Sequence, residues 1–159
     1  MEILLKRILD KIFQIIHYNA SERVIENCIQ FIKFGIVGLS NTVVSYIFNV
    51  LVLLALQPFE VNWDFVAGNM VAFVLSVLWS FYWNNRLVFR AENGEKRSVW
   101  KTLVKTYIAY GFTGIILNNL LSLLWISVLG LSKYIAPLLN LVLSVPLNFI
   151  INKFWAFKA

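Results

Sequence analysis

The chain has 159 residues, of which 60% are hydrophobic and 14% charged, and its mean hydropathy is +0.74. A soluble domain of this size needs more polar side chains to cover its surface, so the composition excludes one and indicates an integral membrane protein. Its 14 Lys and Arg against 8 Asp and Glu give a net charge of +6, but these charges flank apolar runs, which argues against a nucleic-acid-binding protein.

The segment 1–30 predicts an amphipathic helical unit on the cytoplasmic side. Charged residues interrupt any run long enough to span a bilayer, whereas the apolar ones fall on one helical face, at Leu5, Ile8, Leu9, Ile12, Phe13 and Ile16. Such a helix lies in the membrane interface. A signal peptide is disfavoured, because charge is spread through the apolar region and no small-residue cleavage site follows it.

The segment 31–159 predicts a four-helix transmembrane domain. Crossing a hydrocarbon core of ~30 Å takes about 20 mostly apolar residues. Four runs without Asp, Glu, Lys or Arg meet this requirement, at 34–56, 65–85, 106–129 and 134–152. Because unpaired backbone amides are costly in lipid, these runs are expected to be helical, which makes the fold class all-α and polytopic.

Basic residues orient these helices. Of the 14 Lys and Arg, 13 lie before the first run, between the second and third, or after the fourth, and only Lys133 lies in an opposite loop. The positive-inside rule therefore places both termini and the middle loop in the cytoplasm.

The sequence also contains an internal duplication. At an offset of 68, WNNRLVF at the end of the second run resembles INKFWAF at the end of the fourth, and at an offset of 72 Lys33 pairs with Lys105. Two helical hairpins in the same orientation follow, as parallel repeats. The alternative is that short apolar helices with basic ends resemble one another by chance.

Polar side chains recur at helical spacing inside all four runs. One interpretation is a path for sugar hydroxyls, and the other is hydrogen bonding between packed helices, with each bond contributing about 0.6 kcal/mol. The candidate path residues are Asn41, Ser45, Asn49, Asn69, Ser76, Ser80, Asn118, Asn140, Ser144 and Asn148.

The cytoplasmic ends of the runs combine cations with amides. Arg binds phosphate through its planar donor fork and Lys as a point charge, so these ends suit a phosphate or diphosphate group. Ordinary anchoring of the helix ends is the alternative. The candidate phosphate-binding residues are Arg86, Lys33, Lys105, Lys153, Asn84, Asn85 and Asn152.

Several kinds of chemistry have no residues to carry them. The chain has one cysteine, Cys28, and one histidine, His17, and no run contains Asp or Glu. No base, nucleophile, metal ligand set or proton carrier is therefore expected within the runs. Glycine-rich nucleotide loops are also absent. We expect no catalysis, no metal and no cofactor.

The motifs resemble those of the GtrA-like family of small bacterial membrane proteins. The resemblance rests on FIKFGIVGLSNT at residues 31–42, NNRLVF after the second run and NKFWAF after the fourth, and covers residues 30–158. Leu87 departs from the aromatic residue that the family often has there, whereas Trp155 matches it. By position, the matching residues are Lys33, Asn41, Asn84, Arg86, Asn152 and Lys153.

This resemblance implies a function in cell-surface polysaccharide synthesis at the bacterial plasma (inner) membrane. Family members are thought to flip polyprenyl-phosphate-linked monosaccharides to the outer leaflet, where a separate membrane glycosyltransferase uses them. Expected partners are thus this lipid substrate, membrane lipids and the glycosyltransferase. A homodimer is compatible with the little volume that four helices enclose. The alternative function is a non-transporting subunit that scaffolds a glycosyltransferase. A multidrug-type exporter is disfavoured by the lack of an intramembrane acid.

Overall fold

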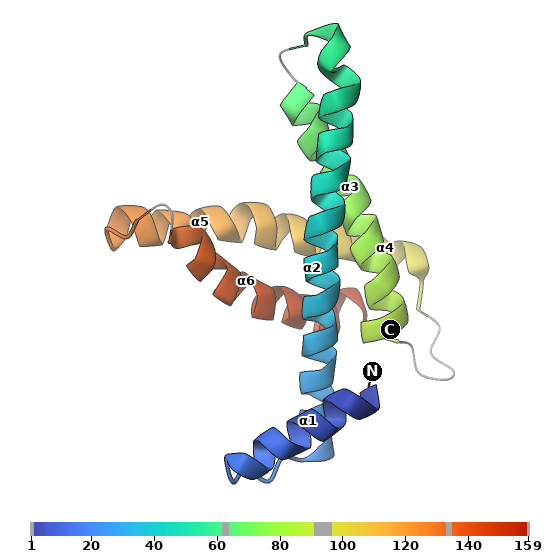
Figure 1. The fold of residues 1–159 in the computed structure, drawn as a ribbon, viewed down its shortest axis with the longest axis vertical. Helices are drawn as coiled ribbons and strands as arrows, with labels where there is room; N and C mark the ends of the chain where they lie inside the picture. The colour runs from blue at the N-terminus through green and yellow to red at the C-terminus, as the bar shows by residue number, and fades with distance from the viewer. Residues whose placement is uncertain (1, 62–63, 91–96, 133–134, 159) are drawn as a thin grey trace.

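A computed structural model describes residues 2–61, 64–90, 97–132 and 135–158, and over these ranges the chain is helical with no strand (Figure 1). Lys96, Lys133 and Tyr134 lie outside the described residues. The elements in chain order are α1 (Glu2–Ile15), α2 (Glu22–Leu56), the 3-10 helix η1 (Gln57–Phe59), α3 (Asp64–Trp83), η2 (Asn84–Val88), α4 (Val99–Gly111), η3 (Phe112–Leu117), α5 (Asn118–Leu123), η4 (Leu124–Val128), α6 (Ala136–Ile151) and η5 (Asn152–Ala156), where η2 to η5 are π-helical.

The all-α fold with four spans is confirmed. Four continuous helical stretches are long and apolar enough to cross a membrane: Glu22–Phe59, Val66–Val88, Val99–Val128 and Leu138–Ala156. The first begins well before the expected start at residue 34, because α2 runs unbroken from Glu22. The expected amphipathic segment and the expected transmembrane domain therefore share one helix across residue 30.

The four spans form two hairpins that diverge from a common end (Figure 1). In the first, α2 and α3 pack against each other over much of their length. The stretch from α4 to η4 and the returning α6 form the second, which points to the left in Figure 1. The hairpins meet where η2 and η5 end, with the Phe89 and Phe157 ring centroids 4.8 Å apart.

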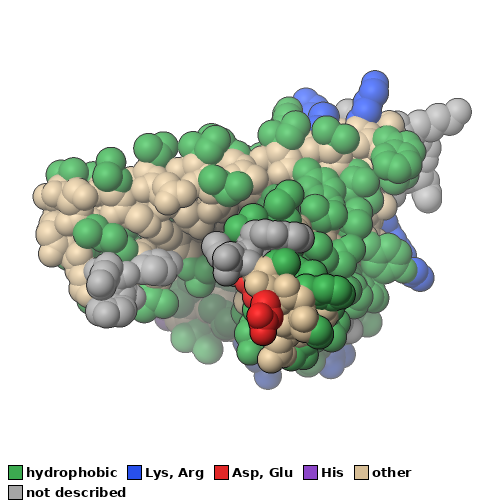
Figure 2. All heavy atoms as spheres, turned by 90° about the horizontal axis from the view of Figure 1, so that it is seen from above, with side chains coloured by type: hydrophobic (Ala, Val, Ile, Leu, Met, Phe, Trp, Pro, Cys, Tyr) green, Lys and Arg blue, Asp and Glu red, His purple; other side chains and the backbone are tan. Residues whose placement is uncertain are grey.

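The hydrophobic core lies at this junction. Its buried members are Phe34, Val37, Phe81, Val88, Phe89, Phe149, Ala156 and Phe157. Away from the junction the spans expose large apolar side chains; Leu39 is 73% exposed and Leu138 64%. Seen from above, hydrophobic side chains gather over much of the surface and Lys and Arg lie at its margins (Figure 2). Such apolar exposure is typical of a surface that faces lipid.

The internal duplication reappears in the backbone. The π-turn η2 starts at Asn84, whose carbonyl accepts a hydrogen bond from Phe89 N at 2.8 Å, and η5 starts at Asn152, whose carbonyl accepts one from Phe157 N, also at 2.8 Å. These pairs are related by the offset of 68. Both signatures thus form the same helix ending, as parallel repeats require.

The N-terminal helix α1 lies beside the N-terminal end of α2 (Figure 1). None of its described residues is buried, and Ile3, Leu4 and Ile15 are more than half exposed. Its amphipathic character agrees with the sequence pattern, and its location in the membrane interface stays a prediction.

Candidate functional site

A cavity of about 800 Å³ opens between α1, the start of α2 and η2. Cations and acids both line it: Lys6, Lys33, Arg86 and Arg90 on one hand, and Glu2, Glu22 and Glu26 on the other. The structure thus brings two of the predicted phosphate-binding residues, Lys33 and Arg86, to one site. Two further cations join them that the sequence reasoning did not assign.

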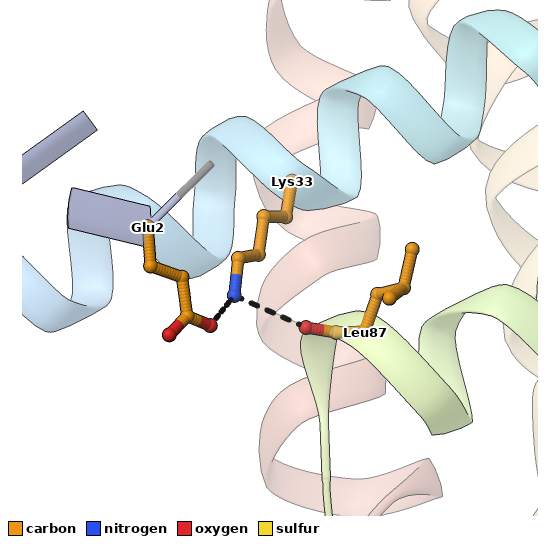
Figure 3. A network of polar contacts seen from close by, with 3 residues as sticks. All are labelled: Glu2, Lys33 and Leu87. Atoms are coloured by element: carbon orange, nitrogen blue, oxygen red, sulfur yellow. Dashed lines mark hydrogen bonds and ion pairs between the residues drawn. The ribbon is translucent and has the colours of Figure 1, made fainter. Parts of the chain in front are cut away.

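Lys33 is the most enclosed cation of this cavity, only 7% exposed. Its Nζ donates to the Glu2 carboxylate and, at 3.3 Å, to the carbonyl oxygen of Leu87 in η2 (Figure 3). The hydrogen bond and the charge of Lys33 hold the pKa of the Glu2 carboxyl below its usual range. Helix α1 therefore touches the transmembrane domain through a buried ammonium.

Lys105 repeats the backbone contact of Lys33 in the second hairpin. Its Nζ donates to the Trp155 carbonyl at 3.1 Å and lies 5.8 Å from the Trp155 ring centroid. Trp155 and Leu87 are separated by the offset of 68, so the two lysines are equivalent in structure. Lys105 does not line the cavity around Lys33.

Lys153 and Arg86 take different environments at this end of the molecule. Lys153 Nζ donates to Asn27 Oδ1 at 2.5 Å and to Gln30 Oε1 at 2.6 Å, which ties η5 to α2. Arg86 is exposed and donates to the Tyr82 hydroxyl at 2.7 Å. Of the four predicted cations, only Lys33 and Arg86 therefore share the cavity.

The two signature asparagines are fully buried. Asn84 Nδ2 donates to Ser80 Oγ at 3.0 Å, and Asn152 Nδ2 donates to the Asn148 carbonyl at 2.8 Å. The Oδ1 atoms of Asn84 and Asn152 are buried without a hydrogen-bond partner. Because neither side chain is exposed, both lie out of reach of a ligand in the cavity. Each is the first residue of its π-turn.

Arg97 is a residue at this junction that the sequence reasoning missed. Its guanidinium donates to the Phe89 and Phe157 carbonyls, at 2.8 Å each, and to Asn85 Oδ1. It also lies 5.1 Å from the Phe157 ring centroid. Since Phe89 and Phe157 are equivalent in the two repeats, Arg97 joins both hairpins at their common end. Charge counting alone gives no signal for this, because Arg97 looks like any loop cation.

A second hollow, of about 490 Å³, lies midway along the first hairpin. We call it the amide groove. Five predicted path residues line it: Asn41, Ser45, Asn49, Asn69 and Ser76. Asn49 Nδ2 donates to Asn69 Oδ1 at 2.9 Å, and Asn41 Oδ1 is buried without a partner. The groove thus offers amide and hydroxyl groups between helices that are otherwise apolar.

The third span closes one side of the amide groove with Tyr110 and Gly114. The Tyr110 hydroxyl shares a hydrogen bond of 2.5 Å with Ser80 Oγ, and Ser80 is fully buried. Sequence reasoning missed Tyr110; a hydroxyl within an apolar run was the available signal.

Apart from Ser80, the remaining predicted path residues lie in the second hairpin and do not line the groove. Asn140 binds within that hairpin: its Nδ2 donates to the Asn118 carbonyl at 3.1 Å and to Ser122 Oγ at 2.7 Å, and its Oδ1 accepts from Trp125 Nε1 at 3.0 Å. Asn148 Oδ1 accepts from Asn152 Nδ2 at 2.9 Å, and Ser144 is half-buried on α6. The four polar rows therefore do not form one continuous lining.

Comparison with known proteins gives consistent matches. A family model described as GtrA/DPMS, transmembrane domain, matches residues 33–157. A cell wall teichoic acid glycosylation protein GtcA of Listeria innocua serovar 6a is 30% identical over 100 residues, covering 61% of this chain and 66%, slightly under two thirds, of the relative. The protein of the same name from Listeria monocytogenes serovar 1/2a is 27% identical over 106 residues, covering 65% of this chain and 70% of the relative. No solved structure gives a significant match.

Proposed function

The chain belongs to the GtrA/DPMS transmembrane-domain family, and from this premise we propose that it flips a polyprenyl-phosphate-linked monosaccharide from the cytoplasmic to the outer leaflet. Family membership and four apolar helices make it a multi-pass membrane protein. The two Listeria relatives bear names of cell wall teichoic acid glycosylation, so the flipped sugar would serve a cell-envelope polymer of a bacterium.

The amide groove is the observation that carries this proposal. A sugar hydroxyl buried without a hydrogen bond costs about 1–3 kcal/mol, so a sugar crosses lipid only where partners replace water. Asn41, Ser45, Asn49, Asn69 and Ser76 supply such partners within one hollow at mid-span. The unpartnered Asn41 Oδ1 is an acceptor that a hydroxyl of the substrate would satisfy.

The basic cavity would receive the phosphate. Lys33, Arg86 and Arg90 line it, and Arg and Lys are the side chains that bind phosphate oxygens. Lys33 and Asn41 are eight residues apart on α2, about 12 Å along the helix axis, so phosphate and sugar sites lie at successive depths. The polyprenyl tail would stay in the bilayer between the helices.

No component that would couple this movement to an energy source is evident in the sequence. No apolar run contains Asp or Glu, so movement would be downhill, drawn by a membrane glycosyltransferase that consumes the sugar outside. The chain itself would be non-catalytic and need no cofactor. A homodimer would give the substrate a larger enclosed path than one copy.

Reconstitution tests the proposal directly. The purified chain in vesicles should speed leaflet exchange of an isotope-labelled polyprenyl-phosphate sugar over protein-free vesicles. Asn49→Leu removes an amide from the groove and should slow this exchange about tenfold, the equivalent of one lost buried hydrogen bond. Asn119→Leu is the matched control, because Asn119 is exposed and donates to the Ile115 carbonyl of its own helix at 2.7 Å.

Two results would contradict the proposal. One is equal exchange in Asn49→Leu and Asn119→Leu, which would remove the groove from the path. The other is a wild-type chain that leaves exchange unchanged but copurifies with a glycosyltransferase, which would favour the scaffold function instead.

A further inference from the structure

Helix α1 places a carboxylate on the cation that the proposed phosphate site depends on. Resting on the proposed function, we propose that α1 is a displaceable plug: Glu2 holds the place of the substrate phosphate on Lys33, and the lipid phosphate displaces it to enter the cavity. The ligand class is a lipid phosphate ester, with free phosphate as the competing source of the same chemistry.

Geometry makes Glu2 and a phosphate compete for the same enclosed ammonium. The Lys33 side chain is only 9% exposed, and its Nζ already binds Glu2 and the Leu87 carbonyl (Figure 3). An ammonium has three donors, and carboxylate and phosphate oxygens accept from it in the same way. Since the Leu87 carbonyl is fixed in η2, the Glu2 carboxylate is the partner that can leave.

The second repeat shows that the fold does not require this carboxylate. Lys105, the equivalent of Lys33, binds the Trp155 carbonyl and, among the described residues, forms no ion pair. Helix α1 precedes only the first repeat, so Glu2 is an addition to the repeated architecture. Because only one of the two equivalent lysines carries a carboxylate, we infer that Glu2 occupies the position on Lys33 that a phosphate would take.

The docking of α1 is weak enough to be reversed. None of the described α1 residues is buried. Besides Glu2, an exposed ion pair between Lys6 and Glu22, 3.8 Å long, links α1 to α2. Exposed pairs of this kind contribute little to stability. The exposed apolar side chains of α1, among them Ile3 and Leu4, would be accommodated at a membrane surface once the helix leaves.

Displacement would open a site of suitable size and charge. With α1 displaced, Arg86 and Arg90 stay in the lining beside Lys33, together with Glu22 and Glu26, so a phosphate reaching Lys33 would meet two further cations. While Glu2 binds Lys33, that lysine is not available to an external phosphate. The apparent affinity of the chain for phosphate is therefore lower, in proportion to the fraction of chains in which Glu2 is displaced.

Binding of farnesyl phosphate to the purified full chain in phosphatidylcholine nanodiscs tests the plug. Glu2→Gln should tighten the dissociation constant about three- to tenfold, because the amide no longer competes as an anion. Asp10→Asn is the matched control: it removes the same charge from the same helix, outside the cavity lining, and should bind as wild type. Glu2→Asp, which keeps the charge on a shorter side chain, should lie between wild type and Glu2→Gln.

Inorganic phosphate, titrated in parallel, separates the two sources of the ligand. Tighter binding of farnesyl phosphate than of inorganic phosphate supports a lipid ligand, whereas equal affinity overturns that assignment. Equal farnesyl phosphate binding by Glu2→Gln and Asp10→Asn, or weaker binding by Glu2→Gln, overturns the plug.

The same variants distinguish this inference from the proposed function. If Glu2→Gln tightens binding while neither it nor wild type speeds leaflet exchange of the sugar lipid, the plug stands and flipping fails. If wild type speeds exchange and Glu2→Gln changes neither binding nor exchange, flipping stands and the plug fails.

Discussion

At the scale of single residues, the width of the amide groove depends on Gly68. A Cβ atom built on Gly68 would lie 3.1 Å from Asn49 Nδ2 and 3.4 Å from the Asn49 carbonyl oxygen. That is closer than comfortable van der Waals contact, so glycine lets α2 and α3 approach until Asn49 and Asn69 meet. The absence of a side chain at one position thus sets the hydrogen bond across the groove.

Gly68→Ala should therefore weaken the Asn49–Asn69 hydrogen bond. Relative to Gly114→Ala, we expect Gly68→Ala to be less stable by about 1 kcal/mol, the typical worth of one such bond. Gly114 is the matched control, because it lines the same groove and an added Cβ meets nothing within 4 Å. Thermal unfolding of both variants in detergent measures the difference, and equal midpoints would show that α2 and α3 adjust freely.

At the scale of elements, the two repeats are joined through their helix ends. Each signature closes in a π-turn that presents a terminal carbonyl, of Phe89 or Phe157, and Arg97 donates to both. A planar guanidinium suits this task because its donors point in several fixed directions. One loop residue thus connects two hairpins that otherwise diverge.

Arg97→Lys should loosen this connection although the charge is kept. A lysine ammonium cannot reproduce the fork that reaches both carbonyls and Asn85, so we expect a loss of about 1–3 kcal/mol, the range for hydrogen bonds to a charged group. Arg23→Lys, at an exposed position of α2, should change stability little. Thermal unfolding in detergent compares the two, and an Arg97→Lys midpoint equal to that of Arg23→Lys would contradict the role given to Arg97.

At the scale of the whole molecule, the bilayer covers the apolar side chains that the protein does not bury itself. The main cluster of buried hydrophobic side chains lies at the junction of the hairpins, and the diverging spans leave apolar side chains such as Leu39 and Leu138 exposed. In water this surface would be unfavourable, whereas in lipid it costs nothing. The positive-inside rule then predicts that the end of the molecule that carries the basic residues faces the cytoplasm.

Cysteine labelling tests this orientation. In a Cys28→Ser background, a membrane-impermeant maleimide should label Gln57→Cys in intact cells and label Lys158→Cys only after permeabilisation. Gln57 lies in η1 at the end of the first span, Lys158 lies near the C-terminus, and both are exposed. The reverse labelling pattern would show that the termini face outward.

The sequence alone was sufficient for the four spans, the helical class, the duplication and the family. Span length, hydropathy and short motifs are each encoded within about 20 neighbouring residues, and the duplication is found by comparing two such motifs. The sequence also marked the polar residues that line the amide groove. Which of those residues share the groove depended on packing, since Asn41 and Ser76 belong to different helices.

Contacts between distant residues were decided only by the tertiary structure. Three such contacts join positions 31 to 126 residues apart: Glu2 with Lys33, Arg97 with Phe157, and Lys153 with Asn27. Periodicity and composition place a side chain on one face of its own helix, but the partner it meets follows from how the hairpins cross and where α1 docks.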